Sequence, residues 1–303
     1  MIHFIVKTGK PRRLWLRNVL ICLCLVVGLA GMPAGCQDGM SQLGEVQRLA
    51  VDMRVQLNLA ATASIRAVMA KTDADSTSFA REAEQARQTM KKDVEAMLPL
   101  LRVLTYTNEV QMLEEFNRHF TEYETMDRRI LALAVENTNL KAQQLSFGPA
   151  QEAAVALRAA LDTLASLASP KNRCRVDSLV ASAALAVREI QVLQAPHIAE
   201  SSDPAMARME KEMAARLTVA HDALGTLAGL IEPSARGQLA VATASLERFA
   251  DIHKQIIALS RRNSNSLSLD LTLGKARSLT AACDGSIGVL QAALAKEGVR
   301  PTR

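Results

Sequence analysis

Aromatic side chains are scarce in this sequence. Phe, Tyr and Trp together make up 3% of the 303 residues, and there are only 14 glycines and 9 prolines. So few aromatic residues argue against a β-sandwich and against a surface that stacks nucleic-acid bases. Ala, Leu, Glu, Gln, Arg and Met fill most of the middle of the chain, and these residues favour helices. The composition therefore predicts an all-α protein.

Motifs of common enzymes and metal sites are also missing. The five cysteines form no CxxC or CxxCH pair, and there is no HExxH, GxSxG, Walker or GxGxxG motif. No Glu lies three residues before a His, which is the spacing that metal sites in helical bundles use. We therefore expect no catalytic residue, no metal and no cofactor. Cys174 and Cys283 are expected to be separate thiols, because an up-down bundle would not place them opposite each other.

The positive charge belongs to the N-terminus. The whole chain carries +5, and residues 1–35 hold five Lys and Arg and no acid. The remaining body is therefore neutral and gives no electrostatic footprint for nucleic acid.

The first 35 residues are typical of an export signal. A basic segment is followed by the short apolar run 19–30 and by small residues before Cys36. Ala34-Gly35-Cys36 resembles a bacterial lipobox, in which the cysteine is lipidated, although Pro33 departs from that motif. Plain cleavage and an uncleaved signal anchor are the alternatives. We expect an exported protein of the periplasm or cell envelope, held at a membrane through its N-terminus.

From Met40 onward the apolar spacing is helical. Breaks near 72–78, 105–108, 136–139, 169–172, 195–204, 232–234 and 262–265 divide the chain into eight helices. This predicts two tandem antiparallel up-down four-helix bundles. The expected organisation is a signal at 1–35, a linker at 36–42, one bundle at 43–168, a second at 173–297 and a tail at 298–303.

The two halves look like a duplication. An offset of 126 residues aligns Leu113 with Leu239, Tyr123 with Phe249, and the Asn137-x-Asn139 turn with Asn263-x-Asn265. In an alternative division the turn of the first half lies at 147–149 instead. Pro149 is expected to kink its helix, and the matching Gly274-Lys275 site is expected to leave a straighter one.

The segments 113–145 and 246–273 resemble the four-helix-bundle sensor domain of methyl-accepting chemotaxis receptors. Both carry an aromatic-bearing helix, an Ile/Leu-Ala stretch and a short Asn turn before a further helix. The resemblance implies an extracytoplasmic module that binds small ligands or protein partners. Because those receptor domains work in pairs, it also implies a homodimer or a pair of bundles within one chain, which the short Pro170 linker could lay side by side. No apolar run after Cys36 is long enough to span a bilayer, as the receptors require.

Arg66 and Arg188 are the candidate ligand-binding residues. Each lies near the distal end of the first helix of its half, where an arginine could hold a carboxylate with two hydrogen bonds. The alternative is an ordinary solvated arginine. The predicted function is a non-catalytic, envelope-anchored ligand-binding module, and the second possibility is a scaffold lipoprotein that contacts another envelope protein.

Overall fold

The computed structural model describes residues 34–298, and side chains from residue 38 onward. The predicted export segment therefore lies almost wholly outside the described residues, as does the tail after Gly298. The described part is helical throughout apart from short connections, which confirms the all-α prediction. The elements are α2 (Ala34–Val68), α3 (Asp73–Val103), α4 (Thr107–Glu136), α5 (Thr138–Leu145), η1 (Ser146–Ala150), α6 (Gln151–Ser166), α7 (Arg173–Ala199), α8 (Asp203–Leu227), η2 (Pro233–Ala235), α9 (Arg236–Arg262), α10 (Ser264–Leu271), η3 (Thr272–Ala276) and α11 (Arg277–Glu297).

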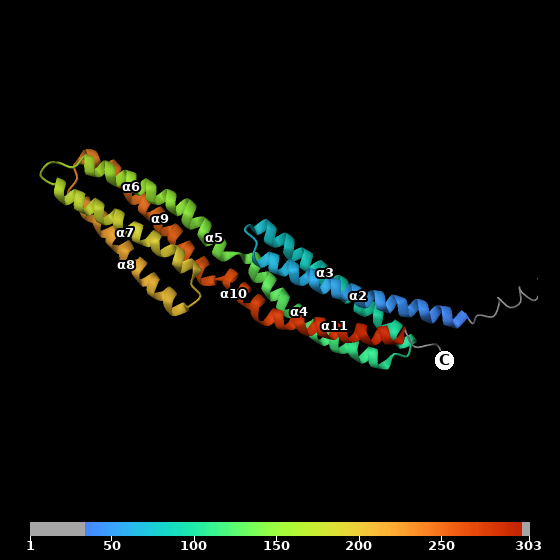
Figure 1. Cartoon of the computed structure of the whole chain (residues 1–303). Helices are drawn as coiled ribbons and strands as arrows, with labels where there is room; N and C mark the ends of the chain where they lie inside the picture. The colour runs from blue at the N-terminus through green and yellow to red at the C-terminus, as the bar shows by residue number, and fades with distance from the viewer. Residues whose placement is uncertain (1–33, 299–303) are drawn as a thin grey trace, which may run out of the picture.

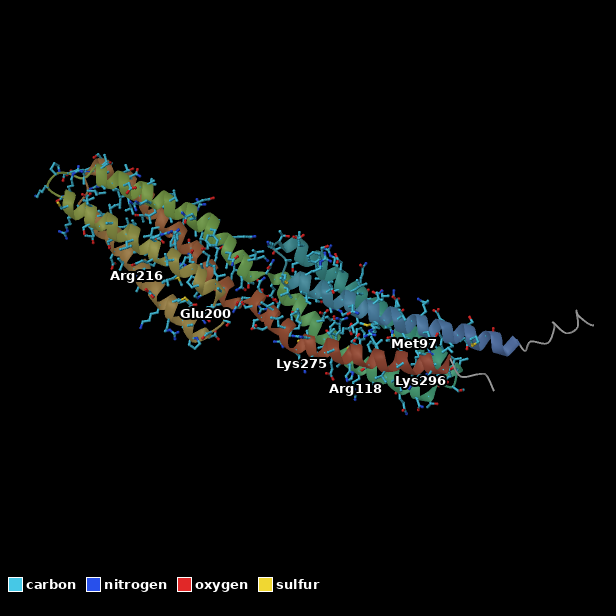
Figure 2. All side chains as sticks on the ribbon, viewed as in Figure 1. Met97, Arg118, Glu200, Arg216, Lys275 and Lys296 are labelled. Carbon is cyan, nitrogen blue, oxygen red and sulfur yellow. The ribbon has the colours of Figure 1, made fainter. Side chains whose placement is uncertain are left out.

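The helices pack into two groups with separate cores. Group A consists of α2, α3, α4, α10 and α11, and group B of α5, α6, α7, α8 and α9. Apolar residues three and four apart supply the buried face of each helix, as Leu113, Phe116, Phe120 and Tyr123 do on α4. The Phe116 and Phe120 rings stack with centroids 5.8 Å apart in the core of group A. Charged side chains such as those of Arg118, Lys275 and Lys296 project outward (Figure 2).

The composition of the groups corrects the expected domain boundaries. The helix predicted to complete the first bundle, within 138–166, packs on α7 and α9 of the second half. Its counterpart, within 264–297, packs on α2 and α4 of the first half. Group B is thus one continuous segment, 138–262, and group A is assembled from 34–136 and 264–297. The predicted units 43–168 and 173–297 are therefore wrong, although the halves are related as expected.

The reason lies at Asn137 and Asn263, where the sequence predicted reversing turns. Each is a single residue in the left-handed conformation, with φ of 53° and 50°. One such residue interrupts the helical hydrogen bonds without turning the chain back, so α4 continues into α5 and α9 into α10. Figure 1 shows the result: two long helical paths cross at the middle, and the two groups lie end to end. The side-by-side arrangement that the Pro170 linker allowed is therefore wrong.

The crossing is held by reciprocal helix caps. The Thr138 N–H donates to the Ser264 hydroxyl over 3.1 Å, and the Ser264 N–H donates to the Thr138 hydroxyl over 3.0 Å. The Asn139 and Asn265 N–H groups each donate to the side-chain oxygen of the other residue, over 3.0 and 3.2 Å. The first N–H groups of a helix have no partner within it. Here α5 and α10 supply those partners to each other.

A π-helical segment follows the crossing in both halves. It spans Ser146–Ala150 in the first half and Thr272–Ala276 in the second. The alternative turn at 147–149 is therefore absent, because the chain stays helical through it. The π-helical segment around Gly274 covers the same five positions as the one around Pro149, so the backbone of the second half is not more regular there. Since the π-helical segment occurs with and without a proline, it belongs to the duplicated backbone and does not depend on Pro149.

Candidate functional site

The two predicted arginines lie far apart in the fold. Arg66 is exposed on the last turn of α2 in group A, and its Nη1 donates to Glu82 Oε2 over 3.1 Å. Its guanidinium also lies 3.9 Å from the centre of the Phe79 ring. These two contacts occupy the guanidinium in linking α2 to α3. The structure does not bring Arg66 and Arg188 together, because Arg188 is on α7 in group B.

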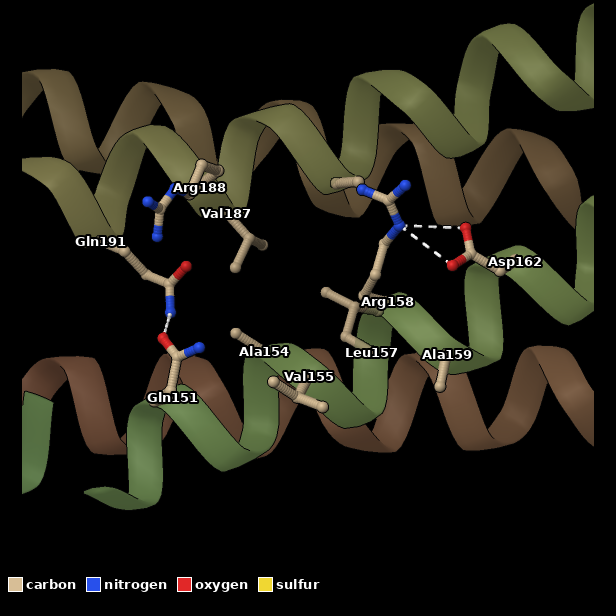
Figure 3. A pocket seen from close by; sticks show the side chains of 11 residues that line it. Gln151, Ala154, Val155, Leu157, Arg158, Ala159, Asp162, Val187, Arg188 and Gln191 are labelled. Atoms are coloured by element: carbon tan, nitrogen blue, oxygen red, sulfur yellow. Dashed lines mark hydrogen bonds and ion pairs between the residues drawn. The ribbon is translucent and has the colours of Figure 1, made fainter. Parts of the chain in front are cut away.

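Arg188 lines an open groove between α6 and α7, which we call the arginine groove. The groove has a volume of about 510 Å³ and includes Gln151, Arg158, Asp162 and Gln191. Figure 3 shows that Asp162 holds the Arg158 guanidinium, with Nε–O distances of 3.0 and 3.1 Å, and that Gln191 donates to Gln151 over 2.7 Å. Arg188 has no ion-pair partner among the described residues. It is exposed, however, so the groove has a charge at its surface and no buried polar group beneath it.

A largely apolar cavity lies in group A, and we call it the apolar groove. It measures about 570 Å³, within the range of small-ligand sites. One wall comes from α2 and the opposite wall from α10, η3 and the start of α11, with α4 between them. Its lining residues are Asn58, Ala61, Ser64, Ile65, Val68, Met69, Tyr123, Asp127, Ile130, Leu269, Thr272, Leu273, Ala276, Arg277, Thr280, Ala281 and Asp284.

A buried polar cluster lies along the α4 side of the apolar groove. Asp127 forms an ion pair with Arg87 of α3, and both side chains are 2% exposed. Ser64 of α2 donates its hydroxyl proton to Asp127 Oδ1 over 2.5 Å. Glu84 also pairs with Arg87, at the edge of the core. The cluster therefore joins α2, α3 and α4 by charge-assisted hydrogen bonds inside an apolar core.

The Tyr123 hydroxyl lies beside this cluster. It is buried without a well-formed hydrogen bond, and the Ser64 hydroxyl is the side-chain group that lies close enough to interact with it. Burial raises the pKa of Tyr123, with the positive charge of Arg87 acting in the opposite direction. A buried polar group without a partner costs about 1–3 kcal/mol, so native structures contain few of them. Because Tyr123 also lines the apolar groove, its hydroxyl is a candidate contact for a bound molecule.

The apolar groove and the arginine groove occupy equivalent places in the two halves. Gln151, Ala154, Val155 and Arg158 line the arginine groove, and the residues 126 positions later, Arg277, Thr280, Ala281 and Asp284, line the apolar groove. The duplicated backbone thus makes a groove beside the same stretch of each fourth helix. The side chains differ between the copies, and so does the chemistry: the group B copy is polar and the group A copy is largely apolar.

Other kinds of site find little support. Within residues 34–298, no cluster of His, Cys, Asp and Glu has the arrangement of a metal site. Cys174 is exposed and Cys283 is buried, and both are free, as predicted. Cys174 belongs to group B and Cys283 to group A, so the two thiols lie in different helix groups and are not merely out of register within one bundle. Burial raises the pKa of the Cys283 thiol to about 12, so this thiol is unreactive at neutral pH.

No known family model matches the chain, and neither does any curated protein. The site must therefore be judged from its own geometry. None of the helices in the described range is both long enough and apolar enough to cross a membrane. The candidate lipidation residue Cys36 lies in the first turn of α2, and its side chain is outside the described set.

Ser64, Arg87 and Asp127 were not among the site residues predicted from the sequence. A signal for Asp127 was present, because it lies between Tyr123 and Ile130 on the apolar face of α4. An acidic residue at a core position is rarely buried unless a cation pairs with it. Arg87 shows the same pattern between the buried Ala83 and Met90 on α3. Their pairing could not be derived from spacing alone, because it depends on how α3 and α4 are aligned.

Proposed function

We propose that this protein is a non-catalytic ligand-binding module of the bacterial cell envelope, anchored through its N-terminus and similar in kind to chemoreceptor sensor domains. Groups A and B act as two four-helix bundles, each with a groove beside its fourth helix. The apolar groove of group A is the ligand site. The observation that supports this most is a cavity of small-ligand size beside a buried tyrosine hydroxyl that has no well-formed hydrogen bond in the protein.

The location of group A agrees with such a role. The Gln47 side chain of α2 donates to the Leu294 carbonyl of α11 over 3.0 Å, so the two ends of the described chain are side by side. A lipid on Cys36 would place group A next to the membrane and group B farther out. Ligand binding in group A would then bear on α11 and, through α10, on the crossing between the groups.

Thermal unfolding against a panel of organic acids, alcohols, amines and amino acids tests this proposal. A ligand at about 100 times its Kd adds about 2.7 kcal/mol to the free energy of unfolding. In a protein of this size the midpoint should rise by several degrees. A class of compounds that raises the midpoint supports the proposal, and a panel without any such compound overturns it.

A scaffold that contacts another envelope protein is the second candidate. Phe147 is 72% exposed and Leu273 is 65% exposed, and they occupy matching positions on the two π-helical segments. Exposed apolar residues at functional irregularities of a helix can mark a contact surface. A photoreactive group placed at residue 147 in cells should then cross-link to a defined protein, whereas one placed at the exposed Arg118 should not.

A further inference from the structure

The charges that line the apolar groove are balanced except for one. Asp127 is paired with the buried Arg87. Asp284 is held by two hydrogen bonds from Arg54, over 2.7 and 2.9 Å. The third charged lining residue, Arg277, is in no ion pair within the described part of the chain and is exposed at the start of α11. The groove therefore presents one uncompensated positive charge.

The remaining surface of the groove suits an apolar body. Ile65 and Val68 contribute from α2, Met69 from the turn that follows it, and Leu269 and Leu273 from the facing elements. Ile65, Met69 and Leu273 are exposed, so the entrance is apolar as well. Water in contact with these side chains would be released when an apolar molecule binds, at about 25 cal/mol per Å² of area buried. The volume of about 570 Å³ admits a molecule of drug size or smaller.

We propose that the apolar groove binds an amphipathic monocarboxylate, with the carboxylate on Arg277 and an aliphatic or aromatic body between α2 and the α10–α11 path. This inference rests on the proposed ligand-binding function and names its ligand class. Arginine suits the role because its planar guanidinium donates two parallel hydrogen bonds to one carboxylate. The body occupies the apolar walls, and its inner end meets the Tyr123 side of the groove.

The same charges select against a second carboxylate. A dicarboxylate of similar length would bring its second group toward Asp127 and Asp284, whose own partners are already engaged. Because Arg87 and Arg54 are already paired with these aspartates, a second carboxylate would lose its water there without gaining a cation. An amine would lose the Arg277 contact and meet a like charge there. The groove is therefore selective for one negative charge at one end of the molecule.

Isothermal titration of the protein with matched probes tests the assignment. We choose 3-phenylpropanoate, 3-phenylpropan-1-ol and 3-(4-carboxyphenyl)propanoate, which share one phenylpropyl body and differ in the groups at its two ends. A hydrogen bond to a charged group is worth more than one to a neutral group. We expect 3-phenylpropanoate to bind about tenfold or more tightly than the alcohol, and the dicarboxylate 3-(4-carboxyphenyl)propanoate to bind more weakly than 3-phenylpropanoate.

Two variants with matched controls locate the site. Arg277→Gln should remove the preference for the carboxylate while leaving the alcohol bound as before, and Arg102→Gln, an exposed change on α3, should alter neither. Ala281→Trp fills the groove from an exposed position and should weaken both probes, whereas Ser278→Trp on the same helix should not. Circular dichroism of each variant checks that the fold is intact.

The outcomes separate this inference from the general function. If the alcohol binds as tightly as the carboxylate, or if Arg277→Gln leaves the preference unchanged, the ligand class is wrong. If neither Ala281→Trp nor Arg277→Gln weakens a probe that binds, the ligand lies elsewhere and only the function survives. If no member of the wider thermal panel binds either, the proposed function fails together with the ligand class.

Discussion

Arg87 and Asp127 form an ion pair that water hardly reaches, each side chain being 2% exposed. Removing one member of such a pair leaves a buried charge without compensation, which typically costs about 3–5 kcal/mol. We therefore expect Asp127→Asn to lower the free energy of unfolding by that amount in urea denaturation. Asp162→Asn is the control, because the Arg158–Asp162 pair is exposed and contributes about 0–1 kcal/mol. Equal, small losses in both variants would contradict a buried pair.

The Tyr123 hydroxyl gives the opposite prediction. Because it is buried without a well-formed hydrogen bond, removing it gives up at most a weak contact with Ser64. Tyr123→Phe should leave the free energy of unfolding in urea unchanged or raise it by up to about 1–3 kcal/mol. The same variant should weaken any ligand whose inner end hydrogen-bonds to the hydroxyl. A clear loss of stability in the absence of ligand would show that the hydroxyl has a structural partner.

His253 and Asp93 make stability depend on pH in opposite directions. Burial lowers the pKa of His253 to about 4, so between pH 6.5 and 4 the unfolded chain binds a proton that the folded chain does not. Stability from this residue is therefore lost as the pH falls through that range. Burial raises the pKa of Asp93 to about 6, so the folded chain takes up its proton first and gains stability as the pH falls from 6 to 4.

Substituting Asp93 and His253 one at a time should separate these two effects on stability. Asp93→Asn removes the contribution that opposes the histidine, so the stability should fall more steeply between pH 6.5 and 4 than in the unmodified protein. In His253→Gln only the aspartate contribution remains, and the slope should be shallower or reversed. Urea denaturation at several pH values measures both. Identical slopes in the three proteins would contradict the burial of these groups.

Among the elements, the crossing of α4–α5 with α9–α10 depends on hydroxyl and amide side chains that cap the opposite helix. Ser264→Ala leaves the buried Thr138 N–H without its acceptor, and Thr138→Val does the same to the Ser264 N–H. Each change should cost about 1–3 kcal/mol. Because both residues share one contact, the double variant should cost less than the sum of the two. The hydroxyls of Thr121 and Thr125 bond only within α4, so Thr125→Val is a suitable control.

The same element shows how far the sequence could predict the fold. The helical content, the aromatic face of α4 and the places where the helices break followed from spacing and composition. The direction of the chain after Asn137 did not, because left-handed asparagines occur both in reversing turns and in simple interruptions. The duplication makes the packing partner of each fourth helix harder to predict. Since both fourth helices carry similar apolar faces, each fits either half, and the choice depends on the caps at the crossing.

For the molecule as a whole, the end-to-end arrangement predicts an elongated particle. The continuous path from α4 to α6 covers residues 107–166 and, at about 1.5 Å per residue, has a length of about 90 Å. Small-angle scattering should therefore give a maximum dimension of about 90 Å or more. A compact particle with a maximum dimension near 60 Å would require the two groups to fold back on each other. The grooves were less predictable than the shape, because they depend on how helices distant in sequence pack together.

The division of group A between the two ends of the chain also sets an order of folding. Group B is one uninterrupted segment, 138–262, and its contacts are available as soon as that segment exists. The core of group A needs residues 43–60 to meet residues 279–294, which closes a loop of more than 200 residues. Such distant contacts form slowly, and when a chain emerges from its N-terminus α11 comes last. Until α11 is present, the helices within 34–136 expose the apolar side chains that α11 would cover. A protein truncated before residue 277 should therefore fold group B but aggregate through the exposed apolar face of group A.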